Sequence, residues 1–210
     1  MRDFLLEANT PTMVDVGANV GHHSLFASTV ASHVHSFEPY PPVRKRLEEK
    51  IRINKLGNVT IHPFGLGNEN DTILFSPPTD NNMGTGSFLS DENNKDFIPL
   101  NIRRADDYFE DAGIHKIDYL KMDVEGFEVE ALQGVKNTLV HSRPVVFFEW
   151  TQVERENDSA PEASLFPSGY SFFKFGTNKP FMVFFNHRTY RLRKLEQSWN
   201  DGNILAVPNE

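Results

Sequence analysis

The feature that most constrains this chain is the alternation of strand and helix patterns along its first 150 residues. Apolar residues recur at near-helical spacing in 21–32 and 43–55. Each of these stretches follows a strand pattern, which is a short apolar run at 12–16 and an alternation of polar and apolar residues at 33–37. Repeated strand–helix units force parallel strands with right-handed crossovers. The pattern therefore predicts an α/β protein with a doubly wound, mostly parallel sheet.

Further elements extend this pattern toward the C-terminus. A strand is expected at 59–62, and the two apolar pieces within 65–78 are expected to form a hairpin. Residues 117–124 read as a strand that leads into one helix, and the apolar run Pro144–Trp150 suits a central strand covered on both faces. Short aromatic strand patterns follow, which predicts antiparallel pairing at the C-terminal edge of the sheet.

Length and composition narrow the classes of function. The 210 residues suit one domain over 1–210. A net charge of −8 disfavours nucleic acid and anionic membrane surfaces as partners, and the lack of cysteine excludes disulfides, thiolate metal sites and a cysteine nucleophile. No run approaches the ~20 apolar residues of a membrane span, and no signal peptide is recognisable. We therefore expect a cytoplasmic protein, with its oligomeric state left open.

The turn after the first strand is the first candidate ligand site, because ligands of such sheets bind at the carboxyl ends of the strands. Glycines at this turn let a ligand approach the backbone. The dinucleotide fingerprint G-x-G-x-x-G would need glycine where Asn19 and His22 stand, so the usual pyrophosphate cradle is missing. The candidate binding residues of this turn are Asp15, Gly17, Ala18, Asn19 and Gly21.

The second candidate is Glu38, which ends the second strand 38 − 17 = 21 residues after Gly17. An acid at this place accepts hydrogen bonds from both hydroxyls of a ribose. A nucleoside without a pyrophosphate fits both sites, and S-adenosylmethionine is such a ligand, with Asp15 facing its α-ammonium group. Three alternatives stay open: turn chemistry alone for the glycines, a nicotinamide-dependent oxidoreductase, and a nucleoside-binding module without catalysis.

Longer motifs extend along nearly the whole chain: VDVGANVGHHSLFAS, SFEPYP, residues 54–67, IDYLKMDVEGFEVEALQG, FFE and NILAVP. In this order they resemble the FkbM family of S-adenosylmethionine-dependent methyltransferases. The resemblance implies a Rossmann-like class I methyltransferase fold and O-methylation of a hydroxyl on a sugar, glycan or secondary metabolite. Family members commonly have more chain before the first strand, so a minimal form and one domain of a longer protein both remain open.

The resemblance also implies roles for the residues of the two candidate sites. The five turn residues would surround the methionine part of the cofactor, and Glu38 would bind the ribose. The acceptor would then be a small molecule or a glycan rather than a nucleic acid.

Three carboxylates, Asp123, Glu125 and Glu149, are expected at adjacent strand ends. Carboxylates that share a cleft repel one another, which raises at least one pKa unless a cation is present. Asp123 is the candidate base or anchor for an acceptor hydroxyl, and Glu125 and Glu149 would orient the acceptor. A divalent ion held by the three is the rival interpretation. Structural roles are the alternatives: a helix N-terminal acid for Glu125 and bonds to loop amides for Glu149.

Histidines give weaker signals. His22 is the reserve base, since it begins the first main helix beside the expected cofactor, whereas His23 is expected to pack beneath the sheet. His33 and His35 share a strand face, but an H-x-H pair without a third ligand does not indicate a metal site. The polar segment 82–88 is expected to form either a lid or a surface loop.

Overall fold

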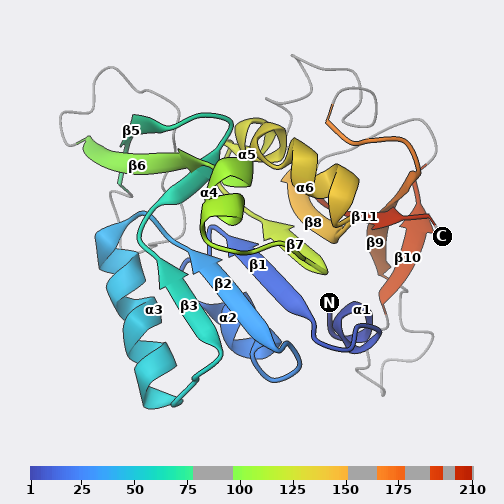
Figure 1. The fold of residues 1–210 in the computed structure, drawn as a ribbon, viewed down its shortest axis with the longest axis horizontal. Helices are drawn as coiled ribbons and strands as arrows, with labels where there is room; N and C mark the ends of the chain where they lie inside the picture. The colour runs from blue at the N-terminus through green and yellow to red at the C-terminus, as the bar shows by residue number, and fades with distance from the viewer. Residues whose placement is uncertain (78–96, 151–164, 178–189, 196–201, 210) are drawn as a thin grey trace.

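The main sheet has eight strands in the order β10-β9-β11-β8-β7-β1-β2-β3. The structure, a computed structural model, describes residues 1–77, 97–150, 165–177, 190–195 and 202–209 (Figure 1). The strands of this sheet are β1 (Thr12–Val16), β2 (His33–Phe37), β3 (Val59–His62), β7 (Tyr119–Met122), β8 (Val145–Trp150), β9 (Tyr170–Thr177), β10 (Tyr190–Lys194) and β11 (Gly202–Pro208).

Strand directions confirm the predicted fold class. Strands β3, β2, β1, β7 and β8 are parallel, whereas β11 runs antiparallel to both β8 and β9. The strand order reverses at β1, which lies between β2 and β7. This is the switch point at which an open α/β sheet binds its ligand.

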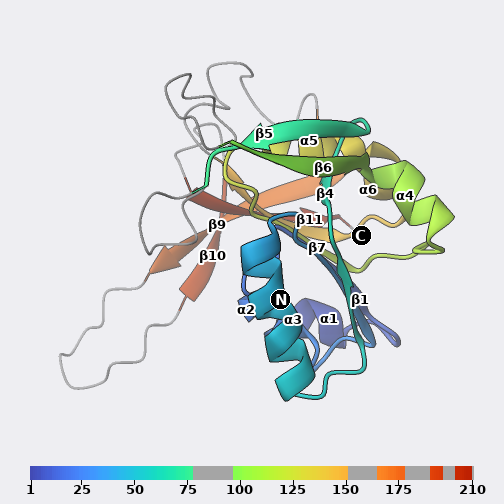
Figure 2. The same cartoon turned by 90° about the vertical axis from the view of Figure 1, so that its left-hand side faces the viewer.

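Helices cover both faces of the sheet (Figures 1 and 2). Met13 of β1 packs with α1 and α2, while Val14 and Val16 pack with α4, α5 and α6, so β1 is buried on both sides. Prolines open α3 at its first two positions, as the sequence predicts. The helices are α1 (Arg2–Leu6), α2 (His22–Ala27), α3 (Pro41–Ile53), α4 (Ala105–Asp111), α5 (Glu128–Gly134) and α6 (Lys136–His141).

The one helix expected after Gly126 is instead two short helices. Val135 interrupts the helix with φ −107° and ψ 19°, so α5 ends at Gly134 and α6 begins at Lys136. The apolar periodicity continues across the break because both helices pack on the same face of the sheet. Periodicity alone therefore does not reveal the interruption.

A second sheet corrects the predicted hairpin at 65–78. Strand β6 (Ile98–Arg104) lies between β4 (Gly65–Gly67) and β5 (Asp71–Phe75), parallel to β4 and antiparallel to β5. The turn does reverse the chain, but its residue Asn70 accepts a hydrogen bond from the Arg104 N–H at 3.0 Å. Strand β6 brings the buried Leu100 and Ile102, which explains why it takes the central place.

The second sheet lies beyond the carboxyl ends of β1, β2 and β3 (Figure 2). Side chains from β5 and β6 face the ends of these strands and form part of a cavity wall there. The fold therefore encloses the switch point between the two sheets. None of the helices in the described parts of the chain is long and apolar enough to cross a membrane.

Candidate active site

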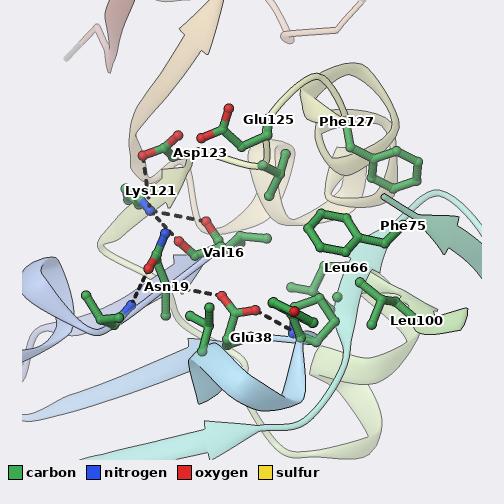
Figure 3. A pocket seen from close by; sticks show the side chains of 18 of the residues that line it. Val16, Asn19, Glu38, Leu66, Phe75, Leu100, Lys121, Asp123, Glu125 and Phe127 are labelled. Atoms are coloured by element: carbon green, nitrogen blue, oxygen red, sulfur yellow. Dashed lines mark hydrogen bonds and ion pairs between the residues drawn. The ribbon is translucent and has the colours of Figure 1, made fainter. Parts of the chain in front are cut away.

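A cavity of about 300 Å³ lies at the carboxyl ends of β1, β2 and β7. Asp123, Glu125 and Lys121 lie together on one side of it, and Glu38 projects from another (Figure 3). An apolar part of the wall comes mainly from the second sheet and from the loop before α5. Its side chains are those of Leu66, Phe75, Leu100, Ile102 and Phe127.

The glycines of the turn after β1 are required by the protein itself. Gly17 and Gly21 have φ values of +70° and +87°, which side chains rarely adopt. A Cβ atom on Gly17 would lie 2.0 Å from the carbonyl oxygen of Asp123, and one on Gly21 would lie 2.4 Å from Leu47 Cδ1. The close packing of Gly17 against Asp123, just after β7, and of Gly21 against Leu47 of α3 is thus a sufficient reason for glycine at both positions.

Asn19 and Glu38 connect this turn to the end of β2. The backbone N–H of Asn19 donates to Glu38 Oε2 at 2.8 Å, and that of Tyr40 donates to Oε1 at 2.9 Å. Asn19 has φ +51°, which asparagine tolerates better than most residues. Burial raises the pKa of Glu38, and the two backbone N–H bonds oppose that rise. Each oxygen keeps acceptor capacity for a further donor in the cavity.

Asp15 lies beneath the cavity rather than on its wall. The side chain is fully buried, and the Ser24 hydroxyl donates to Oδ2 at 2.6 Å. The ammonium of Lys121 lies 3.1 Å from Oδ1, so the negative charge of Asp15 is balanced within the protein. The expected direct contact between Asp15 and a ligand therefore has no counterpart in the cavity lining.

Lys121 is a residue that sequence reasoning missed. It is only 2% exposed, lines the cavity, and donates to the Gly17 carbonyl at 2.8 Å. The signal was present: a lysine in an otherwise apolar strand needs a buried counter-ion, and Asp15 of the neighbouring strand is its register partner.

The three candidate carboxylates differ in position. Asp123 and Glu125 line the cavity, whereas Glu149 does not. The Asp123 side chain is 41% exposed, with Oδ2 3.7 Å from the Lys121 ammonium. Partial burial raises the pKa of Glu125, and the charges of Asp123 and Glu149 raise it further. The mutual repulsion inferred from sequence is therefore present at Glu125.

Glu128 was also missed by sequence reasoning, and it holds the loop between β7 and α5. It is fully buried, with Oε1 accepting from the Val124 N–H at 2.8 Å and Oε2 from the Gly126 N–H at 3.0 Å. The structural role considered for Glu125, an acid at the helix N-terminus, thus belongs to Glu128. Glu125 itself has φ +53° and projects from this loop.

Both histidines at the start of α2 line the cavity and are exposed. The expectation that His23 packs beneath the sheet is wrong, because its side chain is exposed at the cavity wall, where its ring lies 6.4 Å from that of Phe147 on β8. Partial desolvation and the charge of Lys121 lower the pKa of His23. Segment 82–88, the expected lid or loop, lies outside the described residues.

The described parts of the chain contain no cluster of side chains suited to bind a metal ion. No three His, Asp or Glu side chains there are arranged to hold a metal ion. His35 Nδ1 instead lies 3.1 Å from His62 Nε2, and His33 Nε2 lies 2.8 Å from the Thr60 hydroxyl. These hydrogen bonds join β2 to β3.

A doubly wound sheet in which an antiparallel β11 lies between β8 and β9 has the class I methyltransferase fold. The chain belongs to the FkbM methyltransferase family, since the family model for the methyltransferase FkbM domain matches residues 15–192. Membership does not favour the alternative of a nicotinamide-dependent oxidoreductase.

Two curated relatives come from distant organisms. Hexuronic acid methyltransferase AglP of Haloferax volcanii is 34% identical over 125 residues, which cover 60% of this chain and 50% of that protein. The 2-O-methyltransferase NoeI of Sinorhizobium fredii is 25% identical over 173 residues, covering 75% of this chain and 70% of NoeI. The matched part of this chain thus spans half the length of AglP.

Solved structures agree with the fold. The methyltransferase FkbM from Methylobacillus flagellatus superimposes with a TM-score of 0.56 and 20% identity, over 94% of this chain and 44% of that one. SMU.1697c from Streptococcus mutans, solved in complex with SAH, gives a TM-score of 0.52 at 10% identity, and the match covers 99% of this chain and 94% of that one. At these identities the comparison establishes the fold alone.

Proposed function

We propose that this protein transfers a methyl group from S-adenosylmethionine to a hydroxyl of a sugar, glycan or secondary metabolite. The observation that supports the proposal most directly is the arrangement of Glu38. Its carboxylate is 6% exposed, held by two backbone N–H groups, and faces a cavity at the switch point of the sheet. Such an acid suits the two hydroxyls of a ribose.

The chemistry of the cavity wall fits S-adenosylmethionine. The apolar side chains of Leu66, Phe75 and Leu100 offer a surface for a purine beside Glu38. On the other side, the carboxylates of Asp123 and Glu125 suit a ligand with positive charge, such as a sulfonium or an ammonium group. Asp15 would support this site indirectly, through Lys121 and the Gly17 turn, rather than touch the ligand.

A sugar hydroxyl is the acceptor that the relatives favour. Two of them are named as a hexuronic acid methyltransferase and a 2-O-methyltransferase. An alcohol is a poor nucleophile until its proton leaves, so the site needs a base. Asp123 fits this role best, because it is partly exposed at the cavity wall.

S-adenosylmethionine supplies an activated methyl group on a sulfonium, and the protein supplies alignment and proton transfer. Asp123 would accept the proton of the acceptor hydroxyl as the new O–C bond forms and the S–C bond breaks. Glu125 would orient the acceptor from the same side of the cavity, and His22 is the reserve base. Glu149 would act from outside the cavity wall, through its charge on Glu125.

Calorimetry and a turnover assay test the proposal. We expect the purified protein to bind SAH and not NADH, and to transfer labelled methyl from S-adenosylmethionine to members of a panel of hexuronic acid glycosides and neutral sugars. SAH binding without turnover on any acceptor would favour the non-catalytic binding module. Binding of NADH in place of SAH would refute the cofactor assignment.

A further inference from the structure

Lys121 connects the two sides of the cavity. Its ammonium lies 3.1 Å from Asp15 Oδ1 and 2.8 Å from the Gly17 carbonyl. It also lies 3.7 Å from Asp123 Oδ2 (Figure 3). The first two contacts belong to β1 and its turn, and the third belongs to the end of β7. One buried cation therefore touches both the turn on the cofactor side and the carboxylate proposed as the base.

The charge of Lys121 reaches more groups than those it touches. Among the described residues that line the cavity, no other lysine or arginine occurs. Its positive charge lowers the pKa of His23, Glu38 and Glu125, each of which lies on the cavity wall. Asp15 opposes this effect at His23 and Glu38.

We infer that Lys121 is a positioning residue, which holds the Asp123 carboxylate in place relative to the Gly17 turn and sets the charge of the cavity. The inference rests on the proposed function, in which Asp123 takes the proton of the acceptor. The separation of 3.7 Å is an ion pair rather than a hydrogen bond, so Asp123 keeps its acceptor capacity toward the cavity. Lys121 supplies the attraction that keeps this exposed carboxylate over the site.

The backbone around Lys121 also has hydrogen bonds that do not involve its side chain. The N–H groups of Gly17 and Ala18 donate to the Phe37 carbonyl at 3.1 and 3.0 Å, and that of Asp123 donates to Val16 at 3.2 Å. Replacing a whole buried ion pair with neutral residues is often neutral for stability, whereas removing one partner strands a charge. Because of this difference, the informative variant changes Asp15 together with Lys121.

The test compares the double variant Asp15→Asn/Lys121→Met with Lys116→Met, which removes an exposed lysine paired with Asp118 at 3.2 Å. Asn at position 15 keeps an acceptor for the Ser24 hydroxyl. We expect the double variant to fold and to lose up to about 100-fold in kcat, since misplaced catalytic groups cost that order, with a clearly smaller loss of SAH affinity. The control should match wild type.

A titration of the His23 ring by NMR gives a readout that needs no activity. Lys121 lowers the pKa of His23 more than Asp15 raises it, so the pKa should rise in the double variant and stay unchanged in Lys116→Met. Wild-type kcat in the folded double variant, or an unmoved His23 pKa, would overturn the inference. So would equal losses of kcat and SAH affinity, which indicate a merely structural role.

The two proposals fail in different ways. If wild-type protein transfers no methyl group to any acceptor, the proposed function fails, and the His23 titration still decides whether Lys121 sets the charge of the cavity. If wild type is active and the double variant retains its kcat, the proposed function stands and the role of Lys121 is refuted.

Discussion

The two sides of the cavity are built in opposite ways. At the end of β2, Glu38 is 6% exposed and both of its oxygens accept backbone N–H groups. At the end of β7, the side chain of Asp123 is 41% exposed, and Glu125 projects from a left-handed backbone position. The first side is fixed before any ligand arrives, whereas the second leaves its carboxylates accessible.

This difference suits the two substrates of the proposed methyl transfer. A cofactor that never varies is best bound by groups already in place, because no ordering cost is then paid on binding. Acceptors differ between relatives, and an open wall of like charges suits a partner that brings its own hydroxyls or positive charge. Mutations on the fixed side should therefore change affinity or folding, and those on the open side should change turnover.

The largest expected effect is on the open side. Asp123→Asn should lower kcat by about 10²–10⁴-fold, the usual contribution of a general base, with little change in SAH affinity. Asp107→Asn, at a 56% exposed side chain paired with Arg104, is the matched control. Steady-state kinetics and calorimetry measure the two quantities. Full turnover in Asp123→Asn together with its loss in His22→Ala would move the base to the histidine.

A second prediction separates packing from ligand contact on the fixed side. Gly17→Ala should reduce the free energy of unfolding by about 2–5 kcal/mol, since left-handed strain costs about 1–2 and overpacking about 1–3. Gly126→Ala is the control: its φ is +96°, but a Cβ there meets nothing within 4 Å, so only the strain applies. Denaturant unfolding measures both. Equal stability of the two variants would contradict the packing account.

The third prediction concerns affinity. Glu38→Ala removes the acceptor of the Asn19 and Tyr40 N–H groups and of the expected ribose hydroxyls. SAH binding should weaken by about 1–3 kcal/mol, the cost of leaving polar groups unpaired. Glu48→Ala, on the exposed side of α3, provides the control for calorimetry. Wild-type affinity in a folded Glu38→Ala protein would remove Glu38 from the cofactor site.

The strands of the main sheet could be predicted from the sequence, whereas the pairing of the second sheet could not. Strands β1 and β8 are short apolar runs and β2 alternates, and β1 and β2 each precede a clear helix signal, so local patterns suffice to predict them. The pairing of β6 with β4 and β5 joins segments separated by more than 20 residues, and turn residues such as Asn70 mark a reversal without naming a partner. Local patterns therefore predicted elements better than pairings.

The same limit applies to the site. Glu38 could be predicted because its place at a strand end is itself the signal, and the structure brings it to the cavity. Lys121 was not predicted because its role depends on Asp15 of the neighbouring strand. Glu128 was not predicted because its role depends on two backbone N–H groups of its own loop. Burial, which makes such partners necessary, is not visible in a single segment.

The smallest expected effect tests whether the open side is strained by its own charges. Glu125 has its pKa raised by partial burial, by Asp123 and by Glu149, so its charged form is disfavoured in the folded state. A raised pKa adds stability only while the group is protonated, and this gain is lost as the pH rises through the folded value. Glu125→Gln should therefore stabilise the protein at pH 7 and lose this advantage near pH 4.

Because Glu125 is exposed, solvent screening limits the gain to about 0.2–1 kcal/mol. Denaturant unfolding at pH 7 and pH 4 measures it, with Glu110→Gln as an exposed control on α4. A stabilised Glu125→Gln protein with reduced turnover would mean that the open side keeps its like charges for the acceptor at a cost in stability. If Glu125→Gln and wild type are equally stable at pH 7 and at pH 4, water already relieves the repulsion between the carboxylates. The two sides of the cavity would then differ in exposure alone.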